Sequence, residues 1–264
     1  MAAPAWPAAV PIDWARPWLQ PLAAVGRAVA ARADAGAAVA DALNAQGAPA
    51  QGPCAVPRFV GQQALPKGEA YESFIHATGT VPTRDNRHDF FNGLVWLHYP
   101  RTKRLLNQWQ ARAIAQQGVG AVRGPLRDAA TLFDENGAVF FAPAALCEAL
   151  RERAWRRLFV ELRPLWAQAT LLLFGHALME QLLQPRKSLT AHVYCADAAI
   201  DSVADADAWL AGTLDEQAFA AKPFNPLQVL GVPGWWAGNE DFCFYDDPLV
   251  FRSRRPVQAP QQPA

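Results

Sequence analysis

Residues 85–117 read DNRHDFFNGLVWLHYPRTKRLLNQWQARAIAQQ, and this stretch decides the fold because it predicts two consecutive helices. Asp85 or Asn86 can cap a first helix that runs to about Leu97. Pro100 suits the first turn of a second helix, which continues to the end of the stretch because apolar residues recur there at helical spacing. The stretch therefore predicts a helical hairpin.

Further helices and a few short strands are expected on both sides of this hairpin. Helical periodicity marks residues 18–45, 143–153, 155–166, 176–183 and 205–221. Short apolar runs that suit strands occur at 130–133, 138–141, 170–174 and 189–194. The first two runs flank Asn136-Gly137, a pair typical of a tight turn, and so predict an antiparallel hairpin. The expected fold class is α+β, a helix-rich single domain with a small, mainly antiparallel sheet.

The chain is expected to form one domain with short ends that do not pack. Residues 1–10 are interpreted as a flexible N-terminus, 11–255 as a single globular domain and 256–264 as a disordered tail. Within the domain, residues 11–46 form a helical part. A segment rich in Gly, Pro and Gln, 47–68, reads as an extended connection.

The composition excludes several classes of protein. Of the 264 residues, 52% are hydrophobic and 18% charged, which is typical of a globular chain and not of a disordered one. We find neither a secretory signal nor an apolar run long enough to span a membrane, so we expect a cytoplasmic protein without a membrane partner. The four cysteines lack C-x-x-C pairing, which argues against a disulfide scaffold or a zinc knot.

Charge is balanced overall but unevenly placed. Residues 84–127 carry eight basic and two acidic side chains, net +6, whereas residues 195–247 carry ten acidic and one basic, net −9. Two interpretations are open: the two segments pair with each other, or the basic one lines a cleft for an anionic ligand. Zero net charge argues against a nucleic-acid partner.

A polar cluster at the start of the hairpin is the first candidate site. His88, Asn92 and Trp96 share one face of the first helix by i, i+4 spacing. The pair His88-Asp89, with His76 upstream, is similar to the metal ligands of HD phosphohydrolases. In the structural alternative, Asp89 balances the helix dipole and His88 makes a buried hydrogen bond.

A second group of candidates lies in the strand region. His176 and Glu180 are spaced i, i+4, so the carboxylate can orient the imidazole as a base, or both can bind a metal. Asp128, Asp134 and Glu135 surround the predicted β-hairpin, where carboxylates serve either turn chemistry or catalysis. A satisfied core histidine remains the alternative for His176.

Two further features allow a functional or a structural interpretation. Arg123 and Arg127 can hold a phosphate or a carboxylate, or can form salt bridges to Asp128. The Trp-rich stretch at 230–252 can close over a site, or can pack its aromatic rings onto the body. The familiar nucleotide-binding and hydrolase motifs are absent from the sequence.

Several short motifs taken together resemble the bacterial domain of unknown function 3025 family (DUF3025). The motifs are VPTR at 81–84, HDFFN at 88–92, YPRTK at 99–103, TLFDENG at 131–137, FGHAL at 174–178, GVPGW at 231–235 and FYDD at 244–247. The resemblance covers about 11–255. It implies no reaction, cofactor or fold, but positions rich in His, Asp, Asn, Arg and Lys favour a small-ligand site.

Two hypotheses follow. In the first, the protein is an enzyme acting on an anionic, perhaps phosphorylated, small molecule, with His88 or His176 as the base. The residues expected to orient that base or to bind a divalent metal are Asp89, Asp128, Asp134 and Glu180. The residues expected to hold the ligand are Arg84, Arg87, Asn92, Trp96, Lys103, Arg123 and Arg127. In the second, a non-catalytic binding protein uses the basic hairpin and the Trp-rich segment. The identity of any metal and the oligomeric state are not predicted.

Overall fold

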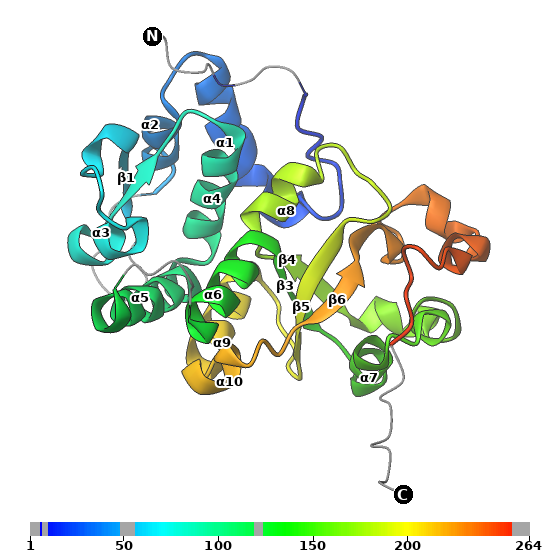
Figure 1. Cartoon of the computed structure of the whole chain (residues 1–264). Helices are drawn as coiled ribbons and strands as arrows, with labels where there is room; N and C mark the ends of the chain where they lie inside the picture. The colour runs from blue at the N-terminus through cyan, green and yellow to red at the C-terminus, as the bar shows by residue number, and fades with distance from the viewer. Residues whose placement is uncertain (1–5, 7–9, 48–55, 119–123, 255–264) are drawn as a thin grey trace, which may run out of the picture.

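The computed structural model describes residues 6, 10–47, 56–118 and 124–254. Helices predominate and the strands form two small sheets, which confirms the predicted α+β class (Figure 1). Most of the predicted flexible N-terminus lies outside the described residues, as do the tail at 256–264, Arg123 and Cys54.

The elements have the following bounds in chain order. The helices are α1 (Ala23–Asp34), α2 (Val39–Asn44), α3 (Tyr71–Thr78), α4 (Arg87–His98), α5 (Pro100–Gln117), α6 (Pro125–Asn136), α7 (Ala144–Glu152), α8 (His176–Gln181), α9 (Val203–Thr213) and α10 (Glu216–Ala220). The strands are β1 (Arg58–Gly61), β2 (Thr80–Thr83), β3 (Gly137–Phe141), β4 (Thr170–Leu173), β5 (Thr190–Ala196) and β6 (Asn225–Gln228).

The helical hairpin predicted from residues 85–117 is present as α4 and α5. Asn86 is the residue that caps α4, because its Oδ1 accepts from the backbone N–H of Asp89 at 2.8 Å. Asp85 instead accepts from the backbone N–H of Val39, at the start of α2. Pro100 occupies the first turn of α5, as expected.

The predicted β-hairpin around Asn136-Gly137 is wrong. Residues 130–133 belong to α6, which begins at Pro125 and runs directly into β3. Helical spacing explains the difference, because Leu126, Ala130 and Phe133 recur on one face of α6. Asn136-Gly137 is therefore a helix-to-strand junction and not a turn between two strands.

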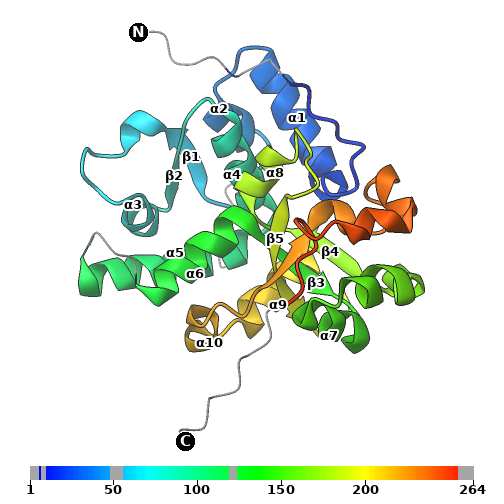
Figure 2. The ribbon, with the colours of Figure 1, turned by 45° about the vertical axis from the view of Figure 1, so that its right-hand side comes forward.

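The larger sheet has the order β4-β3-β5-β6. β4 and β6 pair antiparallel with their neighbours, whereas β3 and β5 run parallel, so the sheet is mainly antiparallel as predicted. β1, which lies within the predicted extended connection, pairs in parallel with β2 in a separate two-stranded sheet. In both ribbon views, α3, α4 and α8 lie on the same side of the larger sheet as the small one (Figures 1 and 2).

The basic and acidic segments meet where α5 packs against α9 and α10. Asp207 of α9 accepts hydrogen bonds from the backbone N–H groups of Arg101 and Thr102 at the start of α5. Arg112 pairs with Glu216 at 2.5 Å. These contacts support the interpretation that the two segments pair with each other.

The Trp-rich C-terminal stretch packs onto the body and does not cover the candidate site. Tyr245 stacks on Phe159, with ring centroids 4.8 Å apart, and Phe251 lies against both rings. Phe159 belongs to a π-helical turn, Arg157–Glu161, that follows α7. Among the described residues, Cys147, Cys195 and Cys243 are free, and no helix combines the length and apolar character that a membrane span needs.

Candidate metal centre

A pocket of about 350 Å³ opens between α3, α4, α5, α6 and α8. Eight of the predicted site residues line it: Arg84, His88, Asp89, Asn92, Trp96, Lys103, Asp134 and His176. Trp96, Lys103 and His176 are nearly fully buried. Candidate residues from segments that are far apart in the chain thus line one pocket.

Two histidines from different helices meet at one end of this pocket. His88 lies in the first turn of α4, and His176 is the first residue of α8. Their Nε2 atoms are 3.0 Å apart and their rings meet edge to face. The two imidazoles therefore direct the same ring nitrogen toward one point.

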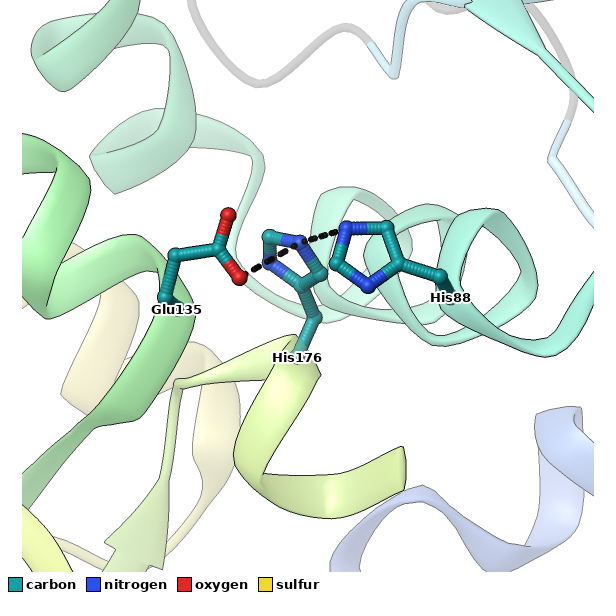
Figure 3. Close-up of side chains that lie close together, drawn as sticks. All are labelled: His88, Glu135 and His176. Atoms are coloured by element: carbon teal, nitrogen blue, oxygen red, sulfur yellow. Dashed lines mark hydrogen bonds and ion pairs between the residues drawn. The ribbon is translucent and has the colours of Figure 1, made fainter. Parts of the chain in front are cut away.

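Glu135, in the last turn of α6, is the third group at this point. Its Oε2 lies 3.6 Å from Nε2 of His176, and one ligand atom from each of the three residues falls within 4.8 Å of the others (Figure 3). Ligand atoms of a tetrahedral zinc ion with bonds of about 2.0–2.1 Å are about 3.3–3.4 Å apart. The three side chains thus have the spacing to hold one divalent ion after small movements.

A close backbone contact places His176 beside α6. Gly175 precedes His176 and lies against the backbone of Asn136, so that a Cβ at position 175 would be only 2.5 Å from the Cα of Asn136. The start of α8 is thereby held against the end of α6, where Glu135 lies.

Each histidine has a carboxylate near its other ring nitrogen. Oε2 of Glu180 lies 3.1 Å from Nδ1 of His88, and Oδ2 of Asp134 lies 3.8 Å from Nδ1 of His176. The predicted pairing of Glu180 with His176 is replaced by pairing with His88. A carboxylate hydrogen-bonded to the far nitrogen of a metal-bound imidazole fixes its tautomer and raises its basicity. Glu180 is at hydrogen-bond distance from His88, whereas the carboxylate of Asp134 acts on His176 only as a nearby charge.

The electrostatics keep His176 neutral. Burial lowers the pKa of His176 to about 4, although nearby Asp134 acts in the opposite direction. Burial would raise the pKa of Asp134, but Lys103 and the two imidazoles together hold it below its ordinary value. At neutral pH, His176 therefore has a lone pair available for a metal, and Asp134 is ionised.

A chain of polar contacts leads from Asp134 across the pocket. Nζ of Lys103 donates to Oδ1 of Asp134 at 2.5 Å and to Oδ1 of Asn92 at 2.8 Å, and it lies over the ring of Trp96. Nδ2 of Asn92 then donates to the hydroxyl of Tyr71 at 3.1 Å. Lys103, which the sequence predicts to hold an anionic ligand, is thus held by two groups of the protein itself.

Asp89 is occupied in a similar way. Its carboxylate receives Nε and Nη2 of Arg84 at 3.1 and 3.0 Å, together with the backbone N–H of Arg84. Such a two-point pair fixes both side chains. Asp89 therefore anchors Arg84 at the pocket wall. It does not belong to the group formed by His88, His176 and Glu135.

A sequence model of a protein family, described as a protein of unknown function (DUF3025), matches residues 57–255. The chain belongs to the DUF3025 family. No curated protein and no solved structure matches the chain. The matched region contains every residue of the pocket, including the three that could hold a metal.

The remaining predicted residues of this DUF3025 chain lie elsewhere. Asp128 pairs with Lys222. Arg127 lines a separate hollow with Arg112, and Arg87 lies beside another hollow, near Glu180. None of these three residues lines the pocket that contains His88 and His176.

The sequence reveals only part of the pocket. Its motifs mark Glu135 only as a carboxylate near the wrongly predicted β-hairpin, and they do not mark Tyr71, Asn107 or Gln110. Lys103, Asn107 and Gln110 follow i, i+4, i+7 spacing on α5, which is a polar stripe that the sequence does display. Tyr71 follows no pattern of this kind.

Proposed function

We propose that this DUF3025 protein is a metal-dependent hydrolase that acts on a small molecule in the cytoplasm of a bacterium. The observation that carries the proposal is the convergence of Nε2 of His88, Nε2 of His176 and Oε2 of Glu135 at the wall of the pocket. Two histidines and one glutamate are a ligand set of catalytic zinc sites, which leave a further position for water.

Hydrolysis is the reaction class that needs the fewest reactants besides the substrate and the metal ion. A divalent ion lowers the pKa of a bound water toward 7, so that hydroxide is available at neutral pH. Water then supplies OH to the electrophilic carbon or phosphorus and a proton to the leaving group, so no oxidant or reductant is required. Glu180 is placed to orient His88 in this reaction, since it lies at the nitrogen that does not face the proposed metal.

The anionic ligand expected from the sequence would meet the metal first. Arg84 and Lys103 already have carboxylate partners in Asp89 and Asp134, so these cations contribute little net charge to the pocket. The metal would be the main positive charge that a ligand encounters. The residues proposed to contact the ligand are those that line the pocket, including Asn92 and Trp96.

The alternative of a non-catalytic binding protein has less support. It needs a basic hairpin and a Trp-rich segment that are free to meet a partner. Arg112 pairs with Glu216, and Tyr245 and Phe251 pack against Phe159. Both features are thus largely used within the chain.

Metal analysis of the purified protein tests the proposal directly. We expect about one equivalent of zinc or another divalent metal per chain. In His88→Ala, His176→Ala and Glu135→Gln the dissociation constant should rise about 100-fold or more, because each removes a ligand atom. His76→Ala is the matched control, since His76 is an exposed histidine outside the pocket. It should bind metal like the wild type, because His76 does not belong to the three residues that converge at the pocket wall.

Activity on a panel of chromogenic esters, amides and phosphates, with and without added metal, completes the test. Activity that requires metal and disappears in His176→Ala supports a hydrolase. A wild-type protein that binds no divalent metal would overturn the proposal. Tight binding of iron in preference to zinc would point instead to oxygen chemistry at the same ligands.

A further inference from the structure

The hydroxyl of Tyr71 lies at the end of the polar chain that starts at Asp134. Lys103 can only donate hydrogen bonds, so the atom of Asn92 that it contacts at 2.8 Å must be the amide oxygen. The amide nitrogen of Asn92 is therefore the atom that faces Tyr71, and the phenol oxygen accepts its hydrogen bond. The orientation of Asn92 follows from its charged neighbour.

This arrangement leaves the proton of the Tyr71 hydroxyl available. Among the described residues, no acceptor for that O–H is found. Burial raises the pKa of Tyr71 well above its ordinary range, and Asp89 and Asp134 raise it further, so the phenol remains protonated around neutral pH. Tyr71 lines the pocket and thus supplies a hydrogen-bond donor that the protein does not use.

An unused acceptor lines the same pocket. Oε1 of Gln110 is buried and has no hydrogen-bond partner among the described residues, although burying such an oxygen without a donor is costly. Gln110 comes from α5 and Tyr71 from α3, and these two helices pack against each other. The α3–α5 end of the pocket thus combines a neutral donor with a neutral acceptor.

This end of the pocket is separate from the proposed metal. α3 and α8 lie on either side of α4 in both ribbon views (Figures 1 and 2). His176 is the first residue of α8, whereas Tyr71 is the first residue of α3. A ligand that reaches both must extend across the face of α4 that carries Asn92.

We infer that the α3–α5 end of the pocket is a subsite for a carboxamide group of the substrate. Tyr71 donates its O–H to the carboxamide oxygen, and Oε1 of Gln110 accepts an amide N–H. This inference rests on the proposed metal centre, which would hold the hydrolysable bond at the other end of the same molecule. A neutral group suits this subsite because the two cations of the pocket, Arg84 and Lys103, already face carboxylates.

Hydroxamates of increasing chain length test at which distance from the metal a carboxamide group binds to this subsite. The hydroxamate end binds the metal, and the far end carries either a carboxamide or, in the matched ligands, an isopropyl group of similar size. The dissociation constants are measured from the visible spectrum of the cobalt-loaded protein. At one chain length, we expect the carboxamide ligand to bind about three- to tenfold more tightly than its isopropyl counterpart.

Variants then test whether Tyr71 causes this gain in affinity for the carboxamide ligand. In Tyr71→Phe the gain should disappear while cobalt affinity stays within about twofold of wild type, since Tyr71 does not belong to the metal-facing set. Asn92→Asp should have the same effect on the gain, because a carboxylate would take the Tyr71 proton away from the ligand. Tyr194→Phe is the control, because it removes a tyrosine hydroxyl that lies outside the pocket. It should retain the gain in affinity.

The outcomes separate the two proposals. A wild-type protein that does not bind cobalt overturns the proposed function and the subsite with it. Cobalt binding without a carboxamide gain at any chain length overturns the subsite alone. A gain that persists in Tyr71→Phe shows that another group holds the carboxamide, and so overturns the role inferred for Tyr71.

Discussion

The aromatic cluster around Phe159 and the pocket around His176 both bury polar atoms, but they leave those atoms in different states. In the cluster, the hydroxyl of Tyr245 donates to the carbonyl of Gly231 at 2.9 Å, and the indole N–H of Trp155 donates to the carbonyl of Arg252 at 2.9 Å.

In the pocket, Nδ1 of His176, Nε1 of Trp96 and Oε1 of Gln110 are buried without a hydrogen-bond partner among the described residues. Unpaired buried atoms also occur elsewhere, such as Oε1 of Gln228 near Val250, but buried polar groups are usually satisfied, so three of them around one pocket mark a region that folding alone does not complete. The comparison suggests that the cluster serves stability and that the pocket serves a ligand.

The largest effect that sharpens this comparison is expected from Phe159→Ala. Phe159 is fully buried and stacks on Tyr245 and Trp166. Its truncation should lower the free energy of unfolding by about 3–5 kcal/mol, measured by urea denaturation. The metal dissociation constant, measured under conditions where the variant is folded, should not change. A large loss of metal affinity would mean that the cluster also shapes the site.

An intermediate effect is expected from Glu180→Gln, which tests the pocket side of the comparison. The substitution keeps a hydrogen-bonding group at Nδ1 of His88 but removes the negative charge. Metal affinity should fall about 10- to 100-fold, with little change in thermal stability of the metal-free protein.

The control for this prediction is Glu216→Gln. Glu216 is exposed to a similar extent as Glu180 and pairs with Arg112 away from the pocket. If both variants bind metal as tightly as wild type, Glu180 does not support His88 in the way inferred.

The smallest effect comes from a pair of hydroxyl deletions. Tyr245→Phe should lower the free energy of unfolding by about 1–2 kcal/mol, because the buried carbonyl of Gly231 loses its donor. Tyr71→Phe should cost less, about 0.5–1 kcal/mol, because the only hydrogen bond lost among the described residues is the one that the oxygen accepts from Nδ2 of Asn92, a residue that lines the pocket. Both values come from urea denaturation of the metal-free protein. Equal losses in the free energy of unfolding would contradict the distinction between Tyr245, whose O–H has an acceptor, and Tyr71, whose O–H has none among the described residues.

The part of the fold that the sequence predicts well is encoded locally. Asn86 and Pro100 mark the beginnings of α4 and α5, and the i, i+4 spacing of His88 and Asn92 places both in one pocket. Such signals depend only on neighbours within a few residues. They remain valid whatever the rest of the chain does.

The wrong predictions arise where contacts between distant segments determine the local structure or the partner of a side chain. Asn136-Gly137 has the composition of a tight turn, but the apolar face of α6 packs inside and extends the helix to that point. Glu180 is spaced to meet His176, yet α8 packs against α4 and brings the carboxylate to His88 instead. Asp89 is similarly held by Arg84, five residues earlier, which spacing alone does not reveal.

The contact between Gly175 and the backbone of Asn136 has a further consequence for the evolution of this site. The distance between His176 and Glu135 is fixed there by main chain against main chain, with no side chain in between. Exchanges among the surrounding side chains can therefore change the shape and polarity of the pocket without moving those two groups apart. Relatives that keep this glycine can thus diversify in substrate while conserving the geometry of the reacting centre.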